Sequence, residues 1–218
     1  MANNGKKVLV TGAAGLIGRE VYLYLKHQGN DVTGIDDYRR STKIDNILEY
    51  NVIDYINNND NEFDYIYHFA AINGTSNFYD RPLDVIKNNT KTDLAVFDFV
   101  ERNKNCKLIY ASTSEIIADT DIIPTPETVD ITINNVHNPR WSYRMSKLLS
   151  ENYLTNSDLR CVIIRFFNLF SEHSNTGHFV YDIINKINNN NYDIIGADET
   201  RSFCYVDDLI EGLYSFMH

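Results

Sequence analysis

A glycine-rich turn near the start of the chain constrains the fold more than any other segment. Residues 7–10 (KVLV) form a short apolar strand, and it leads directly into a turn that contains Gly12, Gly15 and Gly18. Apolar residues at helical spacing follow, in a helix that ends near residue 29. Such a turn lets an anion approach backbone N–H groups at the positive end of a helix. It therefore predicts a dinucleotide pyrophosphate site, although a glycine turn can also be purely structural.

The remainder of the chain alternates between apolar strands and amphipathic helices. We expect strands at residues 31–36, 50–53, 65–70, 108–111 and 161–164, and helices at residues 83–102 and 143–153. The polar run at residues 57–61 is a turn or a frayed helix end. This alternation predicts a mainly parallel sheet with helices on both faces and right-handed crossovers.

Length and charge limit the possible partners. A chain of 218 residues is long enough for one large domain, or one domain with a small appendage. Its net charge of -10 argues against nucleic acid or an anionic membrane surface as the main partner. Residues 1–7 are polar, and no apolar run is long enough to span a bilayer, so we expect a soluble cytoplasmic protein.

The cysteines predict neither a disulfide framework nor a metal site. Cys106, Cys161 and Cys204 are odd in number and widely spaced. Two of them lie in apolar, strand-like segments, where a free thiol behaves as a small buried hydrophobe. We therefore expect three buried, reduced thiols.

Acidic residues at the end of the second expected strand indicate which dinucleotide binds. Asp36 stands where a carboxylate meets the hydroxyls of the adenosine ribose, and Asp37 follows it. A carboxylate there repels a 2′-phosphate, which favours NAD over NADP. Arg39 and Arg40 lie close by and leave NADP as an alternative.

Tyr143 and Lys147 indicate the chemistry. They lie one helical turn apart, and a neighbouring ammonium favours the phenolate of a tyrosine that would otherwise be a poor base. Thr113 ends a core strand, where its hydroxyl can hydrogen-bond the same substrate oxygen. The Tyr-x-x-x-Lys spacing alone is more often a surface pair. Together with the glycine turn, the three residues predict proton and hydride transfer at a sugar-like alcohol.

With these motifs, the sequence resembles the extended short-chain dehydrogenases, specifically the NAD-dependent nucleotide-sugar epimerase/dehydratase group. The resemblance covers nearly the whole chain, and the segments that carry it are residues 11–18, 68–71, 111–115, 143–147, 165–168 and 201–208, with Asn89. It implies a Rossmann-type doubly wound parallel sheet at residues 1–165 and a reduced substrate-binding segment at residues 166–218. It also implies a nucleotide-diphosphate sugar as the substrate.

The motifs and the resemblance together assign the site residues. The expected contacts of NAD are Gly12, Gly15, Leu16, Ile17, Gly18, Asp36, Asp37, Asn51, Val52, Phe69, Ala70, Ala71, Asn89, Tyr143 and Lys147. The expected contacts of the substrate are Ser114, Asn168 and Arg201, of which Asn168 and Arg201 hold the diphosphate. Asn51 stands where relatives usually carry Asp, yet it keeps an acceptor for the adenine amino group. No metal is expected.

Glu115 narrows the reaction. Its position two residues after Thr113 resembles the 4,6-dehydratases and glucuronate decarboxylases, which need a further acid or base after oxidation at C4. An exposed glutamate at the start of a loop is the alternative. The catalytic residues are thus Thr113, Glu115, Tyr143 and Lys147, and the resemblance favours a decarboxylase or dehydratase over a simple epimerase.

Two features leave the function open. Relatives continue past the segment that corresponds to residues 206–208 with elements that close over the sugar nucleotide, and here these are expected to be largely absent. The chain is therefore either an active nucleotide-sugar enzyme or a non-catalytic NAD-binding or regulatory module derived from one. In relatives, the helices that correspond to residues 83–102 and 143–153 pair across a two-fold axis, which predicts a homodimer.

Overall fold

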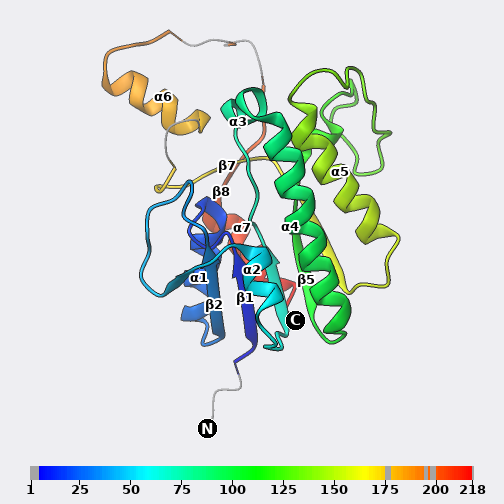
Figure 1. Ribbon diagram of the computed structural model, residues 1–218. Coiled ribbons are helices and arrows are strands. Elements are labelled where there is room, and N and C mark those ends of the chain that lie inside the picture. The colour runs from blue at the N-terminus through cyan, green and yellow to red at the C-terminus, as the bar shows by residue number, and fades with distance from the viewer. Residues whose placement is uncertain (1–4, 175–177, 194–195, 197–199, 218) are drawn as a thin grey trace.

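A six-stranded parallel sheet forms the centre of the protein in a computed structural model, which describes residues 5–174, 178–193, 196 and 200–217 (Figure 1). Its strands are β1 (Lys7–Thr11), β2 (Asp31–Asp36), β3 (Ile47–Glu49), β4 (Tyr65–His68), β5 (Lys107–Thr113) and β6 (Cys161–Phe166). They lie in the order β3-β2-β1-β4-β5-β6, and every pair is parallel. The order in which strands are added to the sheet therefore reverses between β1 and β4, where sheets of this type bind their ligands. The predicted fold class is confirmed.

Helices cover both faces of this sheet. The helices of the described residues are α1 (Leu16–His27), α2 (Val52–Asn57), α3 (Thr75–Asp80), α4 (Pro82–Arg102), α5 (Trp141–Thr155), α6 (Phe179–Asn188) and α7 (Val206–Ser215), with a short 3₁₀ helix, η1 (Ser114–Ile117). Of these, α6 does not take part in covering the sheet. Helix α7 packs on α1 on one face, and α4 packs on α2 and α5 on the other. Two layers of helices thus enclose the sheet.

Alternating strand residues supply the two halves of the core. Val8 and Val10 of β1 point toward α1 and α7, whereas Leu9 points toward α2 and α4, and all three are fully buried. Strands β4 and β5 alternate in the same way. Because both faces are covered, these strands are continuously apolar, which is why they could be recognised from the sequence.

One expected strand is wrong. Residues 50–53 contain the start of α2, and the third strand of the sheet lies just before them, at Ile47–Glu49. Asn51 is the N-cap of α2, since its side-chain oxygen accepts a hydrogen bond from the backbone N–H of Ile53 at 2.9 Å. Val52, Tyr55 and Ile56 then form a buried face at helical spacing.

The segment after β6 forms a small second layer near the cavity described below. Strands β7 (Asn168–Phe170) and β8 (Phe203–Tyr205) make a two-stranded parallel sheet. Helix α6 stands away from the main sheet in Figure 1, whereas α7 returns to pack on α1. Residues 166–218 therefore contribute one helix to the main core, and the predicted division into two parts stays a prediction.

The cysteines only partly follow the expectation. All three are unpaired, but Cys106 alone is buried, while Cys161 and Cys204 are half-buried. Within the described ranges, no group of histidine, cysteine, aspartate and glutamate side chains is suited to hold a metal ion. None of the helices in the described part of the chain is long and apolar enough to cross a membrane.

Candidate active site

A large cavity opens at the carboxyl ends of the strands of the main sheet. Its volume is about 900 Å³, and the glycine turn after β1 and the ends of β2, β4, β5 and β6 all contribute to its walls. Of the predicted site residues, those that line it are Gly12, Gly15, Leu16, Ile17, Gly18, Asp36, Asp37, Asn51, Val52, Phe69, Ala70, Ala71, Thr113, Ser114, Glu115, Tyr143, Lys147 and Asn168. These residues, from seven separate segments of the chain, thus meet in one place.

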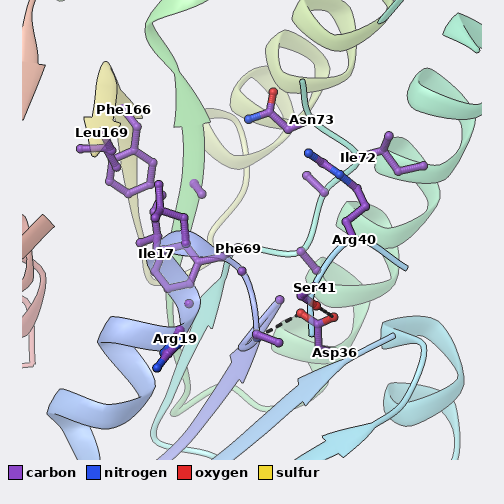
Figure 2. Close-up of a pocket in the computed structure, with 18 of the residues that line it drawn as sticks. Ile17, Arg19, Asp36, Arg40, Ser41, Phe69, Ile72, Asn73, Phe166 and Leu169 are labelled. Carbon is purple, nitrogen blue, oxygen red and sulfur yellow. Dashed lines mark hydrogen bonds between the residues drawn. The ribbon is translucent and has the colours of Figure 1, made fainter. Parts of the chain in front are cut away.

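The cavity has an apolar side and a polar side (Figure 2). Ile17, Phe69 and Phe166 gather on one side, and the ring centroids of Phe69 and Phe166 are 6.3 Å apart. Asp36 and Ser41 lie on the other side, where the Ser41 hydroxyl donates a hydrogen bond to the Asp36 carboxylate at 3.0 Å. A ligand that combines flat rings with hydroxyl groups, as a dinucleotide does, fits such a lining.

Close packing of the backbone at the glycine turn requires glycine at two positions. Gly12 has a φ of +67°, and a Cβ there would lie 2.8 Å from the backbone nitrogen of Ala70. A Cβ on Gly18 would lie 2.1 Å from the Gly12 carbonyl oxygen. Gly15 is the N-cap of α1 and offers no side-chain acceptor to the first turn of that helix. The backbone N–H groups of this turn therefore suit the pyrophosphate of NAD.

Asp36 closes the polar side of the cavity. Its carboxylate accepts hydrogen bonds from the backbone N–H of Ala14 at 3.1 Å and of Tyr38 at 2.8 Å, in addition to the Ser41 hydroxyl. These bonds fix the carboxylate between the glycine turn and the loop after β2. The position is the one predicted for a contact with the ribose hydroxyls.

Two arginines that line the cavity, Arg19 and Arg40, were not among the site residues assigned from the sequence. The Nε atom of Arg19 is buried and has no hydrogen-bond partner among the described residues. Arg40 extends from the loop after β2 toward Ile72 and Asn73, and both burial and the nearby Arg81 lower its pKa. A buried guanidinium nitrogen without a protein acceptor, as at Arg19, is a group that a phosphate satisfies. The available sequence signal was the place of Arg19, directly after Gly18.

Thr113 and Tyr143 meet at the end of β5. Tyr143 is buried on α5, and its ring stacks on Phe78 of α3 with a centroid distance of 4.9 Å and an interplanar angle of 16°. Burial, together with the carboxylates of Glu115 and Asp93, raises the pKa of Tyr143 well above its ordinary value, while the Thr113 side chain acts in the opposite direction. The pKa of Tyr143 in the polypeptide alone is thus raised, opposite to the direction expected from its neighbour Lys147. Phe78 was not predicted.

Lys147 lies one turn further along α5 and is also buried. Its ammonium donates a hydrogen bond to the Tyr110 hydroxyl at 3.1 Å and lies 3.8 Å from a carboxylate oxygen of Asp93. Burial lowers the pKa of Lys147, and the Asp93 carboxylate opposes this effect. Neither Tyr110 nor Asp93 was predicted, because both lie far from Lys147 in the sequence.

Glu115 lies at the rim of the cavity, in η1. Arg140 donates two hydrogen bonds to its carboxylate, from Nε at 2.9 Å and from Nη2 at 2.8 Å. Arg144 approaches the same carboxylate, with its Nε at 3.6 Å. Glu115 is therefore an ion-paired, oriented carboxylate with a side chain 23% exposed, and its catalytic role stays a prediction.

Two predicted residues do not reach the cavity. Among the described residues that line it, neither Asn89 nor Arg201 is present. The amide of Asn89 instead bonds both the backbone N–H and the carbonyl of Ile72, at 2.7 and 3.1 Å. Arg201 donates to the carbonyl of Thr200 at 2.7 Å, whereas Asn168 does line the cavity and donates to the carbonyl of Ser202 at 2.9 Å. Asn89 thus positions the wall that contains Ile72.

The chain is similar to known proteins along nearly its whole length. The model of the NAD dependent epimerase/dehydratase family matches residues 8–218. The UDP-glucuronic acid decarboxylase 1 of Xenopus tropicalis is 28% identical over 98% of this chain and 54% of its own length. The UDP-N-acetyl-alpha-D-glucosaminuronate decarboxylase of Bacillus cytotoxicus is 27% identical over 97% of this chain and 71% of its own length. The chain thus spans about half the length of the frog protein.

A solved structure shows the same fold. The UDP-glucose 4-epimerase of Thermotoga maritima, crystallised with UDP-glucose, superimposes with a TM-score of 0.83 at 23% identity. The match covers 97% of this chain and 73% of the epimerase. The parallel sheet and its helices are therefore shared with a nucleotide-sugar enzyme.

Proposed function

The chain belongs to the NAD-dependent epimerase/dehydratase family, and on this premise we propose that it modifies a nucleotide-diphosphate sugar with NAD as its cofactor. One observation carries the proposal: Thr113, Tyr143 and Lys147 converge at the cavity that the glycine turn opens. The first two come from β5 and α5, which the sheet brings together from distant parts of the sequence. The site therefore has both a place for the dinucleotide and a proton-transferring group beside it.

The proposed roles follow from position and chemistry. NAD, when bound, supplies the acceptor for the hydride that leaves C4 of the sugar. Tyr143 takes the proton of the sugar hydroxyl and later returns it, and Thr113 orients that hydroxyl through a hydrogen bond. The Lys147 ammonium contributes positive charge that favours the phenolate of Tyr143. Because burial raises the pKa of Tyr143 in the polypeptide alone, the added positive charge of the oxidised nicotinamide is part of this proposal.

Within this family we favour decarboxylation or dehydration over simple epimerisation. Both reactions need a group besides Tyr143 that accepts or returns a proton on the sugar ring. Glu115 is such a group, and Arg140 orients it at the rim of the same cavity. The names of the frog and Bacillus relatives, both decarboxylases, support this choice. Asn168, which lines the cavity, is kept as a proposed diphosphate contact. Arg201 would have to turn away from the Thr200 carbonyl to make the same contact.

The test is a panel of uridine, guanosine and thymidine diphosphate sugars with mass analysis of the products. Loss of carbon dioxide, loss of water, or an unchanged mass with altered chromatography distinguishes the three reactions. Tyr143→Phe should lower turnover by about 10²- to 10⁴-fold, because it removes the general acid-base group, and should leave NAD binding largely intact. Tyr192→Phe, the same change at an exposed tyrosine, is the matched control.

Two outcomes would contradict the proposal. Unchanged turnover in Tyr143→Phe would remove Tyr143 from the chemistry. Binding of NAD without conversion of any sugar in the panel would instead support the non-catalytic NAD-binding module.

The homodimer and the cytoplasmic location stay predictions. In the structure, Val96, Phe97 and Phe99 of α4 are packed in the core, while Leu149 of α5 is exposed.

A further inference from the structure

A fully buried carboxylate lies beneath the proposed catalytic residues. Asp93 belongs to α4 and has no exposed surface. Its Oδ1 atom accepts a hydrogen bond from Nε2 of His68 at 2.9 Å. Its Oδ2 atom accepts from the hydroxyls of Tyr110 at 2.5 Å and Ser150 at 2.7 Å. A buried acid with this many donors is unusual and calls for a cation nearby.

The hydrogen bonds around Asp93 favour its ionised form. Tyr110 and Ser150 can each donate a hydroxyl proton to Oδ2, although the Ser150 hydroxyl also lies 3.1 Å from the Ser146 carbonyl oxygen. Nε2 of His68 can donate to Oδ1, while Nδ1 of the same ring lies 2.6 Å from the Thr11 hydroxyl. Burial raises the pKa of Asp93, but Lys147, His68 and Tyr110 together outweigh burial and lower it.

Lys147 supplies the compensating charge. Its ammonium lies 3.8 Å from Oδ2 of Asp93 and 4.6 Å from the centroid of the Tyr110 ring. Among the residues that the structure describes, Lys147 is the only lysine or arginine paired with Asp93. Taking either charge out of water alone is strongly unfavourable, so each keeps the other in its charged form.

Another carboxylate near Lys147, that of Glu151, is already paired with an arginine. Glu151, on the same helix, forms an ion pair with Arg165 at 2.7 Å and accepts a hydrogen bond from the Ser112 hydroxyl. Its charge is therefore largely balanced by Arg165. The remaining groups near the pair are Tyr110 of β5, which accepts a hydrogen bond from Lys147, and Tyr143 of α5, whose pKa is raised. His68 of β4 contacts Asp93 and the Tyr110 ring.

We propose that Asp93 is the positioning residue of Lys147: it keeps the buried ammonium protonated and holds it against the floor of the cavity, one helical turn from Tyr143. The importance of this for turnover rests on the proposed function, whereas the pair itself does not. Asp93 acts through Lys147, because Asp93 does not line the cavity that the described residues enclose. Lys147 is thereby fixed as an ammonium one helical turn from Tyr143, although the Asp93 carboxylate itself raises the pKa of Tyr143.

The charge of Lys147 can be measured without cofactor or substrate. Lysine labelled with ¹³C at Cε reports its own titration by NMR, and Lys147→Met identifies the signal. In Asp93→Asn, which keeps the shape and removes the charge, the Lys147 midpoint should fall by about one pH unit or more, because burial is then unopposed. Asp93→Ser serves the same purpose if Asp93→Asn does not fold.

Two controls separate charge from other effects. Glu151→Gln removes a carboxylate that Arg165 already balances, so it should move the Lys147 midpoint much less than Asp93→Asn does. Tyr110→Phe removes the bridging hydroxyl and keeps both charges, so the midpoint should stay near that of the native protein. An unchanged midpoint in Asp93→Asn, or an equal fall in Glu151→Gln, would overturn the proposal.

The pH dependence of turnover links the pair to function. If Lys147 must be charged, the alkaline limb of turnover in Asp93→Asn should move to lower pH together with the NMR midpoint. A shifted midpoint without turnover on any nucleotide sugar would leave the Asp93 pair standing and remove the proposed function. An unshifted Lys147 midpoint in an enzyme whose turnover depends on Tyr143 would leave the proposed function standing and remove the proposed role of Asp93.

Discussion

The two halves of the cavity are built in different ways. The half next to the glycine turn is formed by the ends of buried strands, and its proposed catalytic residues Tyr143 and Lys147 are 6% and 2% exposed. The other half is formed by β7, β8 and α6, and none of the described residues of α6 is buried. Core packing therefore holds the first half in place before any ligand arrives, whereas few contacts hold the second. Substitutions in the first half, where NAD and the catalytic residues are proposed to meet, should therefore be poorly tolerated. Substitutions in the second half, called the sugar side because the sugar is proposed to bind there, should be well tolerated.

The largest effect of a substitution is expected in the glycine turn, in the first half of the cavity. Gly18→Ala puts a Cβ 2.1 Å from the Gly12 carbonyl oxygen, so the backbone must move, at a cost of about 1–3 kcal/mol or more in the free energy of unfolding. If the displaced backbone also loses that much of its affinity for NAD, the dissociation constant rises by up to about 100-fold. Calorimetry with NAD and denaturant unfolding measure the two effects.

Gly212→Ala is the matched control, because Gly212 is also helical but a Cβ there meets nothing within 4 Å. It should stabilise the protein by about 0.5–1 kcal/mol, as alanine does in place of glycine inside a helix. A fall in stability of similar size in both variants would show that the turn is no more tightly packed than the surface of α7.

The cofactor half was largely predictable from the sequence. Its strands are continuous apolar runs, and Gly12, Asp36 and Tyr143 stand at fixed places relative to those runs. Residues 50–53 were misassigned because Tyr50, Val52 and Ile53 also favour strands, and the capping role of Asn51 was overlooked. Short apolar runs do not distinguish a strand from a helix by periodicity alone.

The buried polar cluster was not predictable in the same way. Asp93 and Ser150 are separated by 57 residues, as are Thr11 and His68. The packing of α4 on α5 brings the first two together, and the pairing of β1 with β4 brings the other two together. A single sequence shows such residues as isolated polar positions within apolar segments. Arg201 was assigned by resemblance alone, and the structure places its guanidinium on the Thr200 carbonyl rather than at the cavity.

A smaller effect on NAD binding should distinguish Asp36, the last residue of β2, from Asp37, which follows it. Asp36→Ala removes the carboxylate that joins Ala14, Tyr38 and Ser41, and with it the proposed ribose contact. We expect NAD to bind about tenfold more weakly, which corresponds to about 1.4 kcal/mol, and the preference for NAD over NADP to decrease. Asp37→Ala is the control, since Asp37 is paired on the surface with Arg39 and should matter less. Equal losses in both variants would show that general negative charge, rather than the fixed carboxylate of Asp36, selects the cofactor.

The smallest effect is expected on the sugar side, at the apolar face of α6. Ile184 is 53% exposed there, whereas Ile210 of α7 is 6% exposed and packs in the core. Ile184→Ala should change the free energy of unfolding by less than about 0.5 kcal/mol, while Ile210→Ala should cost about 2–5 kcal/mol. Because both changes are the same and both lie on helices after β6, denaturant unfolding compares packing alone. A cost above about 1 kcal/mol at Ile184 would mean that α6 is packed as firmly as α7, and the two halves of the cavity would then be equally preorganised.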